Sequence, residues 1–441
     1  MSNVSLETLV SLAKRRGFVW QASEIYGGLA GFYNWGPYGT EVIKNIRQAW
    51  WKAFVYDQPN VVGLDSAIIQ HAKLWQASGH VATFHDPLVE CKHCHYRFRE
   101  DQKEAGKCPN CGKKGPFTKS RHFNLMFRTN VGPLADDSSV SYLRPETAGG
   151  IFTDYELVRE TTRQKIPFGI AQIGKAFRNE ISPRDWLFRV REFEQAELEY
   201  FVHPKQANKE FTRWLKFCKD WLKSIGIDQK KIKDNVLSAK ERAHYAAKNV
   251  DIQYQYPFGF KELWGVAYRT DYDLSAHQKA SGKDLSYFDE TTGDKFVPHV
   301  IEPSLGLDRL FFALLDSAYH EESVRGLPAG RQGEKRVVLR FKPDIAPVKV
   351  AVLPLSKHAK LSPLARKVWS QISGEFRTEY DETQSIGRRY RRQDEIGTPF
   401  CVTVDFDSLK DKAVTIRDRD SMRQTRVKVK ELNQTLAKKL T

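Results

Sequence analysis

The sequence predicts an α+β fold, in which an antiparallel sheet flanked by helices carries a small cysteine-rich insertion and is followed by a separate α/β domain. Residues 169–201 read as two strands joined by a charged loop. Two CxxC pairs lie between residues 91 and 111, and strand and helix patterns alternate from Pro347 onward. A chain of 441 residues is long for one hydrophobic core, which favours this division into domains.

The hairpin at residues 169–201 is predicted to be the centre of the fold. Alternate side chains of a strand share a face. The polar face then holds Gln172, Arg178, Glu180, Arg189, Arg191, Phe193, Gln195 and Glu197, and the opposite face of the return strand holds Val190, Ala196, Leu198 and Tyr200. Arginine forks match phosphate oxygens, an aromatic ring can stack on a base and a carboxylate can accept from an exocyclic amine, so ATP suits this face. The alternative is a half-exposed hairpin with surface ion pairs.

The composition indicates a polyanionic partner. Net charge is +16 and the pI is about 9.4, and a summed positive potential attracts phosphates. The N-terminus lacks an apolar core with a cleavage site, and no run approaches the ~18 apolar residues of a membrane span, so we expect a soluble intracellular protein. Four of the six cysteines are paired as CxxC and two stand alone, which fits a reducing compartment.

The two CxxC pairs predict a structural zinc site. Cys91 and Cys94 are followed, after thirteen residues, by Cys108 and Cys111, which is the spacing of a zinc ribbon. Such a site would fold a short insertion that lacks its own core. His93 and His95 are competing ligands, and a redox CxxC is the weaker alternative.

Hydrophobic periodicity predicts the remaining elements in chain order. We expect helices over 7–16, 40–54, 205–226 and from 307 onward, and strands over 140–143, 259–274 and 296–302. In the last part we expect strands over 349–355, 399–406 and 413–419, a helix over 362–376 and a final helix. Residues 345–441 hold 20 Lys and Arg against 12 Asp and Glu, so half of the net charge lies there.

Several motifs together resemble the dimeric glycyl-tRNA synthetases, a family of class II aminoacyl-tRNA synthetases. The hairpin carries FRNE (177–180) and RVREF (189–193), which resemble the second class II signature. The other motifs are YGGLAGFYNWGPYG (26–39), YLRPETAGGIF (142–152), RTDYDL (269–274), VIEPSLGLDR (300–309) and IGTPFCVTVD (396–405). They cover nearly the whole chain in the family's order.

The resemblance implies a domain organisation and a reaction. It implies a class II catalytic domain over 1–340, with a zinc-ribbon insertion over about 86–120 and a helical insertion over about 204–250, and an anticodon-binding domain over 345–441. The implied reaction activates glycine with ATP to glycyl-adenylate and transfers glycine to the 3′ end of tRNA(Gly). It further implies a cytoplasmic homodimer, with the helix over 40–54 and the Pro37 segment at the subunit interface. A buried intramolecular helix is the alternative there.

The resemblance also implies the site residues. Arg178 and Arg309 would be catalytic, and Glu262 is a possible Mg²⁺ ligand. The implied ATP-binding residues are Arg178, Asn179, Glu180, Phe188, Arg189, Val190, Arg191, Glu192, Phe193, Glu262, Leu263, Gly306, Leu307, Asp308 and Arg309. The implied glycine-binding residues are Arg99, Glu146, Phe193, Glu194, Gln195, Ala196, Glu197, Glu302, Ser304 and Gly306.

Several of these residues and segments have a second interpretation. Glu146 could be a helix first-turn glutamate, and Arg309 could be buried in a pair with Asp308. The basic tract 228–248 could touch the tRNA acceptor stem or form a solvated helical face, and Arg388–Arg392 could contact RNA or face water. Residues 326–336 are expected to be a mobile insertion with no assigned role.

Two other function classes compete with the ligase. A catalytically dead relative serving as a nucleic-acid-binding subunit would be expected to lose the phosphate arginines, but this chain keeps Arg178 and Arg309. An enzyme that charges another small amino acid would keep those arginines and alter the amino-acid pocket.

Overall fold

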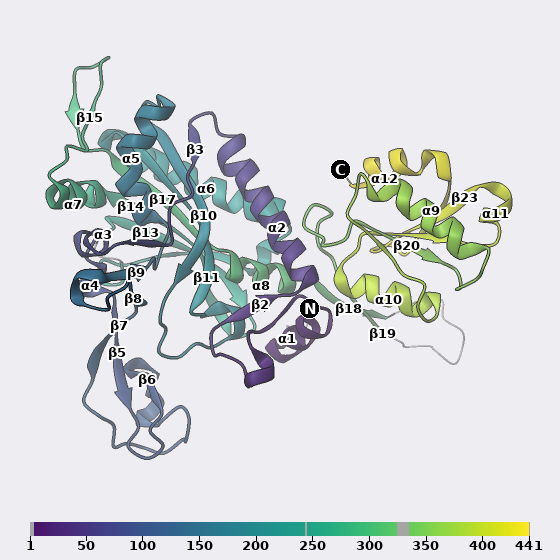
Figure 1. The fold of residues 1–441 in the computed structure, drawn as a ribbon, viewed down its shortest axis with the longest axis horizontal. Coiled ribbons are helices and arrows are strands. Elements are labelled where there is room, and N and C mark those ends of the chain that lie inside the picture. The colour runs from purple at the N-terminus through teal and green to yellow at the C-terminus, as the bar shows by residue number, and fades with distance from the viewer. Residues whose placement is uncertain (1–3, 243–244, 324–334, 441) are drawn as a thin grey trace.

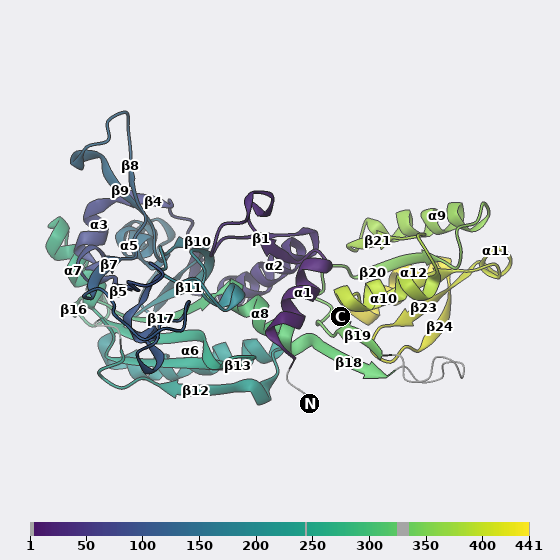
Figure 2. The same cartoon turned by 90° about the horizontal axis from the view of Figure 1, so that it is seen from below.

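The computed structural model describes residues 4–242, 245–323 and 335–440, which form a larger N-terminal part and a smaller C-terminal part. Figures 1 and 2 show the two parts side by side, joined through the ribbon of β18 (Tyr319–Ser323) and β19 (Lys335–Leu339). The predicted domain boundaries at residues 340 and 345 fall on the connection that follows β19. Among the described residues, every helix is either too short or too polar to span a bilayer.

A seven-stranded sheet with the order β12-β13-β14-β17-β11-β10-β3 forms the centre of the larger part. All neighbouring pairs are antiparallel except β10 and β3, so the predicted antiparallel sheet is confirmed. Its strands are β3 (Val61–Gly63), β10 (Phe168–Phe177), β11 (Glu192–Val202), β12 (Ile232–Val236), β13 (Lys248–Tyr256), β14 (Gly259–Thr270) and β17 (His299–Gly306).

The two faces of this sheet are covered differently. One face packs against three helices in an aromatic core, namely α2 (Pro37–Trp51), α6 (Ala207–Ser224) and α8 (Leu307–Ala318). Trp50, Trp214 and Trp264 are fully buried there. The other face is covered at one end by α5 (Ala148–Thr162) and α7 (Tyr272–Ser281), through the cluster around Phe168 and Phe201. The remainder of that face is polar, which leaves room for a site.

Smaller elements surround the sheet. The N-terminal helix is α1 (Leu6–Arg15), followed by the hairpin β1 (Val19–Gln21) and β2 (Tyr33–Trp35). Two three-stranded sheets consist of β4 (Ile69–His71), β8 (Arg128–Asn130) and β9 (Val140–Leu143), and of β5 (His85–Glu90), β6 (Arg97–Arg99) and β7 (Arg121–Asn124). The short helices α3 (Ala72–Ala77) and α4 (His80–Thr83) lie between them in sequence, and β15 (Tyr287–Phe288) pairs with β16 (Lys295–Phe296).

The C-terminal part is an α/β domain with its own core, as predicted. Its sheet has the order β21-β20-β22-β23-β24, in which β21, β20 and β22 are parallel. The strands are β20 (Val350–Pro354), β21 (Thr378–Tyr380), β22 (Phe400–Val404), β23 (Ala413–Asp418) and β24 (Gln424–Lys428). The helices are α9 (Leu361–Ser373), α10 (Ile386–Ile396), α11 (Ser408–Asp411) and α12 (Leu432–Leu440).

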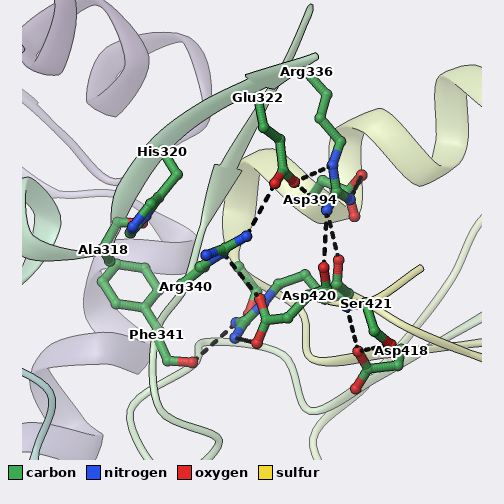
Figure 3. A network of polar contacts seen from close by, with 12 residues as sticks. Ala318, His320, Glu322, Arg336, Arg340, Phe341, Asp394, Asp418, Asp420 and Ser421 are labelled. Carbon is green, nitrogen blue, oxygen red and sulfur yellow. Dashed lines mark hydrogen bonds and ion pairs between the residues drawn. The ribbon is translucent and has the colours of Figure 1, made fainter. Parts of the chain in front are cut away.

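A buried arginine ties the connecting ribbon to the C-terminal domain. Arg336 of β19 is fully buried and contacts Glu322 of β18, and its Nη1 lies 3.0 Å from Oδ2 of Asp394 on α10 (Figure 3). Arg417 Nη1 donates to the other oxygen of Asp394 at 2.8 Å. The expectation of a mobile insertion over 326–336 is therefore wrong for Arg336, because a buried charge with this many partners is held in one place. Residues 326–334 lie outside the described residues.

Two further expectations differ from the structure. The predicted helical insertion over 204–250 contains α6, but then the chain forms β12 and enters β13, which extend the central sheet. The tract 228–248 is therefore not a solvated helical face. In the basic run on α10, Arg389 is fully buried and donates to the carbonyls of Pro354, Asp381, Leu355 and Gln384. That arginine holds loops together and cannot reach RNA, whereas Arg388 is exposed.

Candidate active site

A cavity of about 430 Å³ opens on the polar face of the central sheet, where β11, β14 and β17 lie side by side. It brings together Arg178, Phe193, Glu302 and Arg309, which are far apart in sequence. The other predicted residues that line it are Glu146, Glu180, Phe188, Arg189, Val190, Gln195, Glu197, Glu262, Ser304, Gly306 and Asp308. The strand register brings residues of distant segments together, because Glu197 pairs with Ser304 and Gln195 pairs with Gly306 across β11 and β17.

Two of the arginines at the cavity are held by backbone carbonyls and aromatic rings. Arg178 Nε donates to the Pro145 carbonyl at 3.0 Å, and its guanidinium carbon lies 5.3 Å from the Phe193 ring centroid. Arg309 Nε donates to the Phe188 carbonyl at 3.1 Å, and its guanidinium carbon lies 4.4 Å from the Phe188 ring centroid. Because both forks are oriented before any ligand binds, this end of the cavity suits phosphate groups.

The alternative pairing of Arg309 with Asp308 is not found. Arg309 Nη1 instead lies 3.1 Å from Oε2 of Glu262, and Asp308 accepts the backbone N–H of Glu194 at 2.9 Å. Arg309 stands in the first turn of α8, whose unpaired N–H groups favour an anion. The third arginine of this end, Arg189, lies 3.3 Å from Oε2 of Glu180.

The end of the cavity at Glu146 and Glu302 is acidic. Burial raises the pKa of Glu302 to about 8; the charge of Arg269, whose Nη1 lies 3.0 Å from Glu302 Oε2, opposes that shift, and nearby carboxyl groups add to it. Burial would also raise the pKa of Glu146, but the contact with His80 and the charges of Arg269 and Arg178 outweigh it and lower this pKa to about 2. In the free enzyme these two neighbouring carboxyls therefore differ in protonation, which avoids two uncompensated negative charges side by side before a cation binds.

Glu197 holds the residues around this acidic end in place through hydrogen bonds. Its Oε2 accepts the N–H groups of Thr147 at 2.9 Å and Ala148 at 3.0 Å, at the start of α5. Its Oε1 accepts from Gln195 Nε2 at 2.8 Å and from Ser304 Oγ at 2.5 Å. The carboxylate is thus saturated, and it anchors both the helix N-terminus and the Ser304 hydroxyl.

Glu146 precedes α5 instead of lying in its first turn. The helix begins at Ala148, while Glu146 is buried on the cavity wall. The first-turn alternative for Glu146 is therefore wrong.

Eight predicted site residues do not line the cavity. Leu263, Leu307 and Ala196 are buried in the hydrophobic core. The other five make contacts elsewhere. The Asn179 N–H donates to the Leu125 carbonyl, and Arg191 donates to the carbonyls of Glu180 and Ala30. Glu192 forms an ion pair with Lys175, Glu194 with Arg47, and Arg99 with Asp86 and Asp101. Asn179, Arg191, Glu192 and Glu194 belong to the hairpin itself, so their contacts hold its shape.

Part of the cavity wall was not predicted. Glu241, Tyr245, Asn249 and Asp251 line it from the stretch between β12 and β14. Burial and the neighbouring charge of Glu262 raise the pKa of Asp251 to about 7, against the opposing charge of Arg309. The alternation of polar and apolar residues from Asn249 to Tyr254 is a strand signal that could have placed Asn249 and Asp251 on one face.

The four cysteines of the predicted zinc ribbon converge in space. Their sulfur atoms all lie within 4.8 Å of one another, with Cys91 Sγ 3.8 Å from Cys111 Sγ and Cys94 Sγ 3.7 Å from Cys108 Sγ. A tetrahedron with metal–sulfur bonds of about 2.3 Å has edges of about 3.8 Å, so the set fits zinc. The competing His93 contacts the Gly115 carbonyl at 3.1 Å, and His95 contacts Glu90 at 3.1 Å. Neither belongs to the sulfur cluster.

Comparisons with known proteins match both parts of the chain. A family model described as the tRNA synthetase class II core domain (G, H, P, S and T) matches residues 130–318, and one described as the anticodon binding domain matches residues 349–439. The chain is 50% identical to the glycine–tRNA ligase of Caldanaerobacter subterraneus subsp. tengcongensis and 51% identical to that of Clostridium acetobutylicum, over 99% of both chains in each case. It is 49% identical to the glycine–tRNA ligase of Thermobifida fusca, over 99% of this chain and 98% of the relative.

Proposed function

Because the chain belongs to the glycine–tRNA ligase family, with a class II tRNA synthetase core, we propose that the cavity on the central sheet is where glycine and ATP react. The family resemblance found from sequence motifs is thereby confirmed, and the enzyme attaches glycine to tRNA. The observation that carries the assignment of the site is the convergence of Arg178, Phe193, Glu302 and Arg309 on one cavity.

The proposed mechanism relies on positioning and on charge stabilisation. The glycine carboxylate attacks the α-phosphorus of ATP in line, and pyrophosphate leaves. The terminal ribose hydroxyl of tRNA then attacks the carbonyl carbon of the mixed anhydride, and AMP leaves as the hydroxyl loses its proton. Arg178 would hold the α-phosphate, Arg189 and Arg309 the distal phosphates, and Phe193 would stack on adenine. No covalent enzyme nucleophile is needed, because oriented donors stabilise the charge that develops on the phosphate.

Selectivity for glycine is a problem of exclusion. Glycine offers little to bind except its charged ends. We place its ammonium among Glu146, Glu302 and Ser304, where the adjoining residues are buried and leave little volume for a β-carbon. The residues that lie off the cavity, among them Arg99, Asn179 and Arg191, would act by holding the surrounding loops.

An exchange assay with three amino acids tests this function. We expect ATP–pyrophosphate exchange with glycine and not with alanine or serine. Exchange with none of the three would favour the dead accessory subunit, and exchange with alanine or serine would favour a ligase for another small amino acid.

Magnesium would be held near Glu262. Carboxylate oxygens are the ligands that Mg²⁺ prefers, and Glu241 and Asp251 line the same wall of the cavity. A bound Mg²⁺ would neutralise charge on the phosphates. Glu262 would then exchange its ion pair with Arg309 for the metal, which frees Arg309 for a phosphate.

Glycine binding is expected to tighten as the pH rises. With a pKa of about 8, the Glu302 carboxyl of the free enzyme keeps its proton at neutral pH and loses it at higher pH. The glycine ammonium favours the charged carboxylate, so binding expels this proton. KM for glycine should fall roughly 25-fold from about pH 6.5 to about pH 8.5 and then level off. Exchange kinetics at saturating ATP measure KM for glycine at each pH, and KM for ATP at saturating glycine is the control. A KM for glycine that does not change with pH would contradict the assignment.

The cysteine cluster is proposed to hold one structural Zn²⁺. All of its sulfur ligands come from the protein, so it would fold the insertion and not act on substrate. Cys108→Ser is expected to lose the metal and to raise hydrogen exchange across residues 86–124, because metal binding supplies about 10 kcal/mol or more to such folds. Elemental analysis and hydrogen exchange measure this. His93→Gln is the matched control and should keep its zinc; metal loss there would point to a histidine ligand.

We also propose a homodimer in the cytoplasm. Three large apolar side chains of the segment before α2, those of Ile25, Tyr26 and Leu29, are exposed, which suits an interface. All six cysteines, each in the described part of the chain, are free thiols, as in a reducing compartment. Sedimentation at micromolar concentration tests the dimer, and a monomer at that concentration would contradict it.

A further inference from the structure

A histidine outside every predicted motif reaches the acidic end of the cavity. His80 begins α4, and its Nε2 lies 3.3 Å from Oε2 of Glu146. Both side chains are nearly buried, at 11% and 10% exposure. The contact joins two segments that are separated in sequence by the whole cysteine-rich insertion.

The imidazole is held in place on its other side. Ser78 Oγ lies 2.8 Å from His80 Nδ1, and Ser78 is buried. The rings of Trp75 and Phe84 pack edge-on against it, with centroids at 5.4 and 5.6 Å. Trp75 in turn packs on α5, where a methyl group added at Gly149 would lie 2.9 Å from its ring. The histidine therefore has little freedom to rotate.

The hydrogen-bond partners decide which ring nitrogen carries a proton. The pKa of Glu146 is lowered to about 2, so its carboxylate only accepts hydrogen bonds. His80 Nε2 must then be the donor, and in the neutral ring Nδ1 accepts from the Ser78 hydroxyl. If the ring is charged, Ser78 accepts from Nδ1 and can donate to the Trp75 carbonyl, 3.4 Å away. In both states His80 presents the same N–H to Glu146.

We propose that His80 is a positioning residue for glycine, and that Ser78 fixes its tautomer. The inference rests on the proposed function, in which Glu146 receives the glycine ammonium. Without the Nε2–H, the buried Glu146 carboxylate would be drawn toward the charges of Arg178 and Arg269, its other favourable neighbours. Such a shift would remove a glycine ligand.

Substitutions that mimic one ring nitrogen at a time test the proposal. Glutamine can place its amide N–H near the position of Nε2, whereas the shorter asparagine reaches only the position of Nδ1. We expect His80→Ala and His80→Asn to raise KM for glycine about tenfold to a hundredfold. His80→Gln should keep KM for glycine much closer to the wild-type value. KM for ATP should stay within about twofold of wild type. Ser78→Ala should show a smaller increase of about threefold to tenfold.

Exchange kinetics and thermal melting of the full-length enzyme provide the measurement. A merely structural role would lower the melting temperature and affect both substrates, with no rescue by Gln, and that result would overturn the proposal. Equal KM values for glycine in wild type and His80→Ala would also overturn it.

A double-mutant cycle separates this inference from the function on which it rests. If His80 acts through Glu146, His80→Ala should add less than about twofold in an enzyme that already carries Glu146→Gln. Full additivity would overturn the role of His80 alone. If Glu146→Gln itself leaves KM for glycine unchanged, the proposed role of Glu146 fails, and the proposal for His80 fails with it.

Discussion

Glu302→Gln is expected to lose glycine-dependent adenylate formation by about a hundredfold to a thousandfold. The substitution keeps the shape of the side chain and removes the charge that would receive the glycine ammonium, while the buried Arg269 keeps its pairs with Asp273. Removing one partner of a buried charge pair costs about 3–5 kcal/mol, which corresponds to this loss of rate. ATP–pyrophosphate exchange measures it. Near-normal exchange with glycine would remove Glu302 from the role.

Glu199→Gln is the matched control for that substitution. Pairing of Glu197 with Ser304 and of Tyr200 with Ile301 places Glu199 directly opposite Glu302 in the sheet. Glu199 is fully buried, and within the described residues neither of its carboxyl oxygens has a hydrogen-bond partner. Burial and the nearby Glu302 raise its pKa well above the ordinary value, which favours the protonated form. An isosteric neutral amide should therefore keep exchange within about threefold of wild type.

Arg178→Ala is expected to reduce the rate of adenylate formation about a thousandfold, with a much smaller change in KM for glycine. Its guanidinium is oriented by the Pro145 carbonyl and by the Phe84 and Phe193 rings. Losing one preorganised group that stabilises charge in the transition state costs about a hundredfold to a thousandfold, and Arg178 carries a full charge. Single-turnover formation of glycyl-adenylate separates this step from binding.

Arg191→Ala belongs to the same hairpin and serves as its control. Arg191 donates to the carbonyls of Ala30 and Glu180 and lies off the cavity. Its loss should leave the rate within about fivefold of wild type, because these hydrogen bonds are the same in the ground state and the transition state and so do not lower the barrier. Equal losses in the two variants would mean that the integrity of the hairpin, and not contact with the α-phosphate, limits the reaction.

Local patterns were sufficient for much of the fold and for the floor of the site. Alternation along the return strand placed Phe193, Gln195 and Glu197 on one face, and these residues line the cavity. The same alternation placed Ala196 and Leu198 on the other face, where they are buried in the core. The cysteine spacing likewise predicted a cluster that the structure brings together. These features could be predicted because strand geometry and ligand spacing act within a few residues.

The contacts between distant segments could be seen only in the folded chain. Nothing near His80 in sequence points to Glu146, and nothing near Arg336 points to Asp394; each pair meets because separate elements pack against each other. The sequence predicts that the basic run containing Arg389 contacts RNA or faces water, yet Arg389 is buried among carbonyls of neighbouring loops. Periodicity states which side of an element is apolar, but the partner across that side depends on how helices and sheets are arranged in three dimensions. For this enzyme, the sequence therefore indicated the reaction and many of the residues that line the cavity, whereas tertiary packing decided which other side chains contact them.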